Sequence, residues 1–142
     1  MAGNIDWVFL RADPALAFSW LKYARGLPEN DPELIKARNN LVRSRLMDRV
    51  LRRENPGGSW DRPESPYLPK YKSTYWQFIL LGHLGALVEL ARVKRAAGFI
   101  QGLQEADGFW PSESRGVGLE KKGEPSLWVT LKATETLRRL GI

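Results

Sequence analysis

A short turn with the pattern glycine, any residue, tryptophan occurs twice in the chain, about 50 residues apart. The first copy is Gly58-Ser-Trp60, which follows a helical run from Leu34 to Arg53. The second is Gly108-Phe-Trp110, which follows a helical run from Val93 to Leu103. Glycine adopts positive φ easily and so reverses the chain after a helix, and a tryptophan two residues later can fold back onto that helix. The repeated turn therefore predicts helices that end in clamped turns.

The similarity between the two halves extends beyond the turn. The same four residue types recur with identical spacing, first as Thr74, Leu81, Leu84 and Gly85 and then as Thr130, Leu137, Leu140 and Gly141. Apolar and polar residues nowhere alternate over a stretch long enough to predict a strand. We therefore predict a single all-α domain over residues 1–142. Its about six helices would form repeat units at roughly 32–85 and 87–142, after N-terminal helices at 4–31.

Aspartate followed by proline marks two helix starts, because aspartate caps a helix and proline fits its first turn. Asp13-Pro14 predicts a helix that extends to about Ala24, and Asp31-Pro32 predicts one long helix to about Glu54. The apolar stripe expected to face the core of the long helix consists of Ile35, Val42, Leu46 and Val50.

The later segments are predicted from their prolines and helix caps. Residues 61–72 contain three prolines and are expected to form an ordered loop, held down by the rings of Tyr67 and Tyr71. The apolar run Phe78–Leu90 is interpreted as buried helix, because it is shorter than the about 20 residues that a membrane span needs. Residues 111–125 are expected to be a second loop, and Ser126 is expected to cap a final helix at 127–140.

Cysteine is absent from the chain, which excludes disulfides, thiolate zinc sites and cysteine nucleophiles. The first residues lack the basic segment and the long apolar stretch of a signal peptide. We therefore expect a cytoplasmic protein without a membrane span.

The formal net charge is +6, so the location of the positive charge matters. On the predicted long helix, Arg38, Arg45, Arg49 and Arg52 would fall on one stripe at about 100° per residue. We interpret this stripe as the solvent-facing side of an amphipathic helix, because no nucleic-acid-binding motif accompanies it.

The residues of the second turn resemble a known motif. Gln104-x3-Gly108-x-Trp110 is similar to the QW motif of squalene–hopene and oxidosqualene cyclases. The unit that runs from Gly58 and Trp60 through Thr74 to Gly85 resembles the repeats of the wider prenyltransferase and squalene-cyclase-like group. This resemblance implies an α/α toroid in which inner helices line an apolar cavity. A full ring takes about six helix pairs, so this chain resembles half a ring.

The resemblance does not extend to the chemistry of that group. The bacterial cyclases use an Asp-x-Asp-Asp acid, which this sequence lacks, and its closest acidic residues are Asp61, Glu64 and Asp107. The zinc site of the protein prenyltransferases and the thioester of the complement-type relatives both need a cysteine. We therefore assign no catalytic residue, no cofactor and no metal site.

Three local features remain as candidate sites. His83 is the only histidine, and we interpret it as a hydrogen-bonded structural residue rather than a lone general base. Gly116-Val-Gly118 with Lys121-Lys122 lacks the features of a phosphate-binding loop and is interpreted as a surface loop. Five aromatic residues either line a pocket for an apolar ligand or belong to the core: Trp20, Tyr75, Trp76, Phe78 and Trp128.

The sequence leaves three functions open. The first is a non-catalytic helical-repeat module that binds a partner chain or forms a homodimer, because three helix pairs would leave an open edge. The alternative is an isoprenoid- or lipid-binding protein, or an enzyme of the cyclase or prenyltransferase type that uses Asp61 or Asp107 as its acid. Nucleic-acid binding through the arginine stripe is the weaker third hypothesis.

Overall fold

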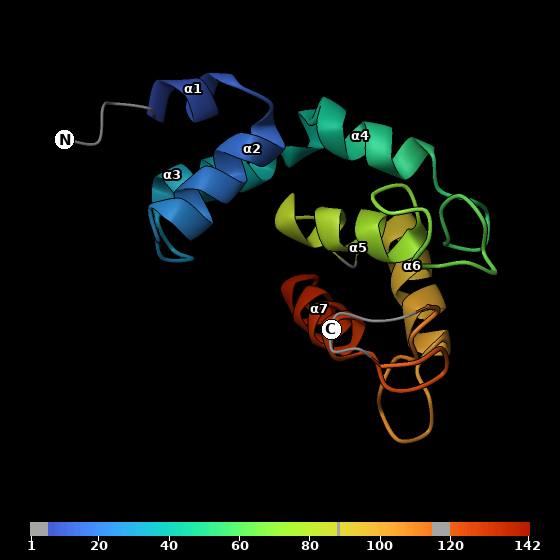
Figure 1. Ribbon diagram of the computed structural model, residues 1–142. Coiled ribbons are helices and arrows are strands. Elements are labelled where there is room, and N and C mark those ends of the chain that lie inside the picture. The colour runs from blue at the N-terminus through green and yellow to red at the C-terminus, as the bar shows by residue number, and fades with distance from the viewer. Residues whose placement is uncertain (1–5, 88, 115–119) are drawn as a thin grey trace.

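The structure, a computed structural model, describes residues 6–87, 89–114 and 120–142. This part of the chain contains seven α-helices and no strand, which confirms the predicted all-α class (Figure 1). The α-helices are α1 Asp6–Arg11, α2 Pro14–Ser19, α3 Pro32–Asn39, α4 Arg45–Arg52, α5 Thr74–His83, α6 Ala91–Gly102 and α7 Leu127–Arg139. A π-helical turn, Trp20–Ala24, extends α2, and a 3₁₀ turn, Asn40–Arg43, follows α3.

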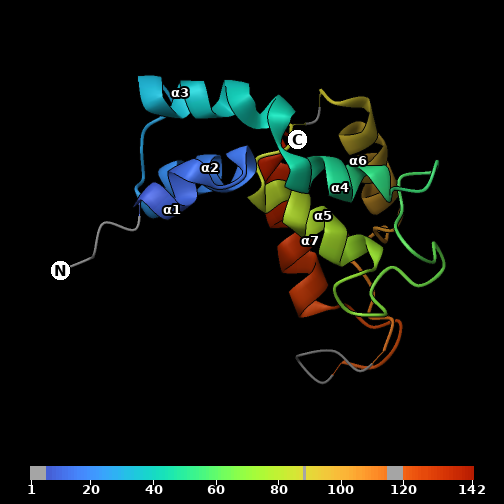
Figure 2. The same cartoon turned by 90° about the horizontal axis from the view of Figure 1, so that it is seen from above.

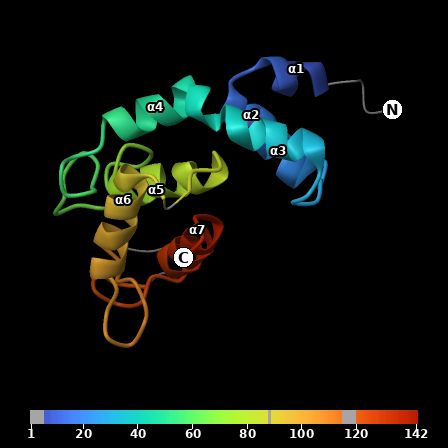
Figure 3. The same cartoon turned by 180° about the vertical axis from the view of Figure 1, so that it is seen from behind.

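Helix α5 lies at the centre of the fold. Figure 1 shows it between α4 and α7, and Figure 3 shows α6 crossing close to one end of it. Phe78 and Leu81 of α5 are completely buried. Gly82 allows α7 to come close, since a Cβ atom there would lie 2.9 Å from the Thr136 Cγ2 atom. The core is therefore built around α5, and α5 packs most extensively on α7.

The two predicted turns form and make the same hydrogen bonds. Gly58 and Gly108 have φ values of +92° and +89°. The indole N–H of Trp60 donates to the Val50 carbonyl at 2.8 Å, and that of Trp110 donates to the Ile100 carbonyl at 2.7 Å. Both indoles are thus buried against the last turn of the preceding helix.

The threonines that follow each turn also have matching roles. The hydroxyl of Thr74 accepts from the Trp60 backbone N–H at 3.0 Å, and the hydroxyl of Thr130 accepts from the Trp110 backbone N–H at the same distance. Each turn is therefore held to the helix before it by the indole and to the helix after it by a threonine.

Helix α5 ends at His83, so the prediction of one buried helix over Phe78–Leu90 is wrong in its second half. The chain closes the helix at Gly85, where φ is +82°, and the Ala86 N–H donates back to the Leu81 carbonyl at 3.1 Å. A Cβ at Gly85 would lie 2.5 Å from the Phe18 ring. The turn is thus fixed by both backbone conformation and packing.

The predicted long helix over 34–53 is also wrong, because Ser44 interrupts it. Ser44 has extended backbone angles and caps α4 by accepting from the Met47 N–H at 3.0 Å. The Asp13 carboxylate approaches this break and accepts from the backbone N–H groups of Arg45 at 2.7 Å and Leu46 at 3.1 Å. Asp13, which caps α2, therefore also caps the start of α4.

This break changes which residues face the core. Ile35 and Val42 of the predicted apolar stripe are exposed, Leu46 is half-buried and Val50 is buried. Instead, the core receives Leu34, Ala37, Leu41 and Met47. Arg38 lies on α3, apart from the arginines of α4, so the predicted single stripe of four arginines does not exist.

The N-terminal helices form a unit at one end of the molecule, where α3 runs alongside α2 with α1 next to them (Figure 2). The predicted caps Asp13, Asp31 and Ser126 all accept from backbone N–H groups of the helices they start. In the loop before α5, Tyr67 is half-buried as expected, but Tyr71 is 72% exposed, so the prediction that its ring is buried is wrong. The Tyr71 ring still contacts Trp76, at a centroid distance of 5.1 Å. Among the described residues, no helix is long and apolar enough to cross a membrane.

Candidate functional site

Four of the five aromatic residues predicted as a pocket lie together. Tyr75, Trp76 and Phe78 of α5 face Trp128 of α7 around a gap that leaves no room even for a water molecule. The Trp76 indole N–H donates to the Tyr67 carbonyl at 3.0 Å, and burial raises the pKa of the Tyr75 hydroxyl. These four residues therefore join α5 to α7 and leave no open ligand site between them.

Trp20, the fifth residue, lies in a different place. It lines an open groove of about 480 Å³ between the N-terminal helices and the ends of α5 and α7. Its ring stacks on Phe9 at a centroid distance of 4.2 Å, and its indole N–H donates to the Asp6 carboxylate at 2.8 Å. Leu16 and Tyr23 continue the apolar wall of this groove. Its volume is that of a small-molecule site, and its wall is aromatic and apolar.

His83 and Arg139 form the polar rim of the groove. An Arg139 Nη1 atom lies 3.0 Å from the His83 Nδ1 atom, and the Nη2 atom donates to the Glu135 carboxylate at 3.0 Å. The guanidinium also lies over the Tyr23 ring, 4.5 Å from its centroid. Burial, followed by the positive charge of Arg139, lowers the pKa of His83. A histidine that stays neutral and accepts a hydrogen bond from arginine is held in one orientation, which agrees with its predicted structural role.

The predicted candidate acids do not lie in this groove. Asp61, Glu64 and Asp107 are all exposed, and none lines the walls described above. A general acid that works at neutral pH needs its pKa raised, usually by burial, and exposed carboxyls lack that condition. In the described residues, no group of three or more histidine, aspartate or glutamate side chains is arranged to hold a metal ion. Gly116-Val-Gly118 falls outside the described residues.

The structure identifies one buried carboxyl that the sequence analysis missed. The Glu54 side chain is only 1% exposed, and its Oε1 atom lies 3.6 Å from the Arg95 Nε atom. Neither carboxylate oxygen has a hydrogen-bond donor among the described residues. Burial raises the pKa of Glu54, although the nearby charges of Arg95 and Arg92 oppose this effect. The carboxyl sits beside the first turn, away from the groove.

Comparison of the two turns explains why Glu54 is poorly satisfied. Glu54 occupies the position that Gln104 holds in the second turn, four residues before the glycine. The Gln104 amide donates to the Gly108 carbonyl at 2.8 Å. A carboxylate cannot donate this bond, so the first turn lacks the clamp that the second turn has.

We predict that Glu54→Gln stabilises the fold by about 1 kcal/mol at pH 7, because it removes a buried charge and supplies the missing donor. The folded-state pKa of Glu54 lies above its ordinary value of 4.5. Below the unfolded-state pKa, Glu54 is protonated in both the folded and the unfolded protein, so the cost of burying its charge is absent. This cost grows as the pH rises toward the folded-state pKa.

The stabilisation should be measured by urea unfolding at about pH 7 and again at about pH 4, where it should shrink. Glu105→Gln, an exposed position in the second turn, serves as the control and should change little. A loss of stability at both pH values would show that the ion pair with Arg95 outweighs the cost of burial.

Comparisons of the chain with protein families, with curated proteins and with solved structures found no match. The described residues form an all-α fold with an open groove that has an aromatic wall. Arg139 and the neutral His83 lie at the polar rim of this groove.

Proposed function

We propose that this chain is a non-catalytic helical module that binds another helical unit of its own kind, and that it does so through the free side of α7. The observation that carries the proposal is a pair of exposed leucines one turn apart on α7. Leu127 is 69% exposed and Leu131 is 60% exposed. Residues four apart lie on the same face of a helix, so together they form an apolar edge.

The position of this edge is supported by the equivalence between α5 and α7. Counted from the matching threonines Thr74 and Thr130, Tyr75 of α5 corresponds to Leu131 of α7. Tyr75 is buried where α5 meets α7. Its counterpart Leu131 is exposed, because no described helix covers α7 in the way that α7 covers α5.

The other end of the described chain supports the same proposal. Helix α1 has no buried residue, and its side chains Trp7, Val8 and Leu10 are exposed. In repeat arrays, a terminal helix that is not a cap exposes the surface that a neighbouring unit would cover. We therefore propose that the chain corresponds to half of an α/α ring, with open surfaces at both ends.

Self-association is the test of this proposal. We expect the mass from light scattering to rise from that of a monomer toward that of a dimer as the protein concentration increases. Leu131→Glu should keep the protein monomeric, because losing the burial of one leucine costs about 1.5–3 kcal/mol, which is tenfold or more in affinity.

Val42→Glu is the matched control, because Val42 is 88% exposed and lies in the 3₁₀ turn after α3, on a groove that contains no α7 residue. This variant should associate like the unchanged protein. A mass that stays monomeric at every concentration, or a Leu131→Glu variant that still dimerises, would refute the proposal.

A further inference from the structure

Most of the chain's excess positive charge lies on α4, on the start of α6 and on the residues that flank them. Residues 43–54 and 89–95 contain eight basic and three acidic side chains, a net charge of +5, whereas the whole chain has a net charge of +6. We call the eight basic side chains the basic face. They are Arg43, Arg45, Arg49, Arg52, Arg53, Arg92, Lys94 and Arg95, and all of them are exposed.

The two segments of the basic face are neighbours in space. The Arg92 Nη1 atom donates to the Leu51 carbonyl at 3.2 Å, which joins the start of α6 to the end of α4. Gly58, in the turn after α4, lies directly against the α6 backbone at Arg95. Residues about 40 positions apart in the sequence therefore contribute to one surface.

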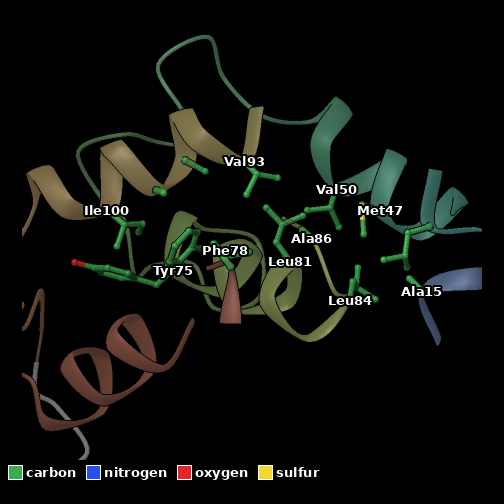
Figure 4. Close-up of a cluster of buried hydrophobic side chains, with 14 of the residues drawn as sticks. Ala15, Met47, Val50, Tyr75, Phe78, Leu81, Leu84, Ala86, Val93 and Ile100 are labelled. Atoms are coloured by element: carbon green, nitrogen blue, oxygen red, sulfur yellow. The ribbon is translucent and has the colours of Figure 1, made fainter. Parts of the chain in front are cut away.

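The basic side chains lie opposite the core. Figure 4 shows that Met47 and Val50 of α4 and Val93 and Ile100 of α6 point toward the interior around α5. With about 100° per residue, Arg45 and Arg49 fall on the opposite side of α4 from these buried residues. The basic face is thus the outer surface of this part of the molecule.

Only part of this charge is neutralised within the protein. Asp48 forms an ion pair with Arg52, and Glu54 lies beside Arg95. Apart from Arg92, which donates to the Leu51 carbonyl, the other five basic side chains have no ion pair among the described residues. They are Arg43, Arg45, Arg49, Arg53 and Lys94. Five cations on this surface are therefore available to an anionic partner.

We propose that the basic face binds the phosphate backbone of nucleic acid without reading its sequence. Seven of the eight side chains are arginine, whose planar fork matches the oxygens of a phosphate group. Helix α4 has eight residues and is about 12 Å long, which spans about seven phosphate charges along a duplex.

The composition of the surface favours nucleic acid over an anionic membrane. A helix that binds a membrane surface normally inserts large apolar side chains between its basic ones. Within α4 and α6 themselves no large apolar side chain is exposed, and the exposed apolar residues nearby, Val42, Leu87 and Leu90, lie in the segments that flank the two helices. Contacts from the two helices would thus be made mainly by charge, as in phosphate-backbone binding.

The proposal is tested with the full chain and a fluorescently labelled duplex DNA of random sequence, by fluorescence anisotropy at several salt concentrations. If about four phosphates are neutralised, the affinity should fall about 100-fold between about 50 and 200 mM salt. Two unrelated duplex sequences should give the same affinity within about threefold, because phosphate contacts carry no sequence information.

A pair of double variants separates the basic face from net charge. Arg49→Glu with Lys94→Glu reverses one charge on each helix of the face, and Lys121→Glu with Lys122→Glu makes the same change in net charge on the loop before α7. The first pair should lower the affinity at low salt at least about tenfold and reduce the salt slope by about 2, whereas the second should have much less effect. Circular dichroism should show unchanged helix content in both.

Two results would overturn the proposal. One is the absence of DNA binding at low salt. This result would overturn the proposal also if the protein sediments with vesicles that contain phosphatidylserine, since the basic face would then bind a membrane instead. The other is an equal loss of affinity in the two double variants, since this would attribute binding to net charge rather than to α4 and α6.

Discussion

Replacing Gly58 by alanine is expected to cost about 3–5 kcal/mol of folding free energy, a large share of the total stability of a domain. Gly58 has a φ of +92°, where an L-residue with a side chain is strained. An added Cβ would also lie 2.4 Å from the Arg95 carbonyl oxygen and 2.9 Å from the Ala96 nitrogen. These are backbone atoms of α6, so relief requires the helix itself to move.

Gly108→Ala provides the matched control in the same turn geometry. Gly108 has a φ of +89°, but the nearest atom to an added Cβ is the Gln104 Nε2 atom at 3.9 Å. Only the conformational cost remains, about 1–2 kcal/mol. Urea unfolding followed by tryptophan fluorescence measures both variants. Equal losses would mean that α6 can move away from an added Cβ at Gly58 without a cost in stability.

The difference between the two glycines bears on the proposed function. A Cβ at Gly58 has no room because α6 packs on the first turn. No described atom other than the Gln104 amide comes within 4 Å of the equivalent position at Gly108. The second turn therefore has free space where the first turn contacts α6, and this supports the proposal that a further helical unit packs on this part of the protein.

The features that the sequence predicted well depend on neighbouring residues. The Gly-x-Trp turns and the aspartate caps at Asp13 and Asp31 each follow from the preferences of one or two residues that act within the same stretch of chain. Local preferences of this kind are visible in a single sequence, which is why the all-α class and the clamped turns could be predicted.

The features that the sequence missed depend on contacts between distant segments. The periodicity of residues 34–53 favours one helix, but it cannot show that a carboxylate from position 13 would start a new helix after Ser44. For the same reason, the sequence could not show that Trp20 lies in a groove apart from Trp76, or that α4 and α6 share one charged surface. The burial of Glu54 had no sequence signal, because Gln104, which holds the equivalent position in the second turn, is exposed.

Replacing Asp13 by alanine is expected to destabilise the fold by about 2–4 kcal/mol, because one carboxylate serves two helices. It accepts from the Ala15 N–H at 2.9 Å at the start of α2. Across the chain it accepts from the Ser44 hydroxyl at 2.5 Å and from two backbone N–H groups of α4. Asp31, which also precedes a proline, caps only α3 through the Glu33 N–H at 2.8 Å. Asp31→Ala should therefore cost only about 1 kcal/mol.

The pH dependence separates the charge of Asp13 from its shape. Burial acts to raise the pKa of Asp13, but the hydrogen bonds from Ser44 and from the backbone N–H groups outweigh it and lower the pKa below 3.8. Its contribution is then fully present above the unfolded-state pKa and is lost as the pH falls through the folded-state value. The difference in stability between the unchanged protein and Asp13→Ala should stay constant from about pH 7 to 5 and decrease toward about pH 3. A difference that does not change with pH would mean that the neutral acid caps α4 equally well, and that the break at Ser44 does not depend on the carboxylate charge.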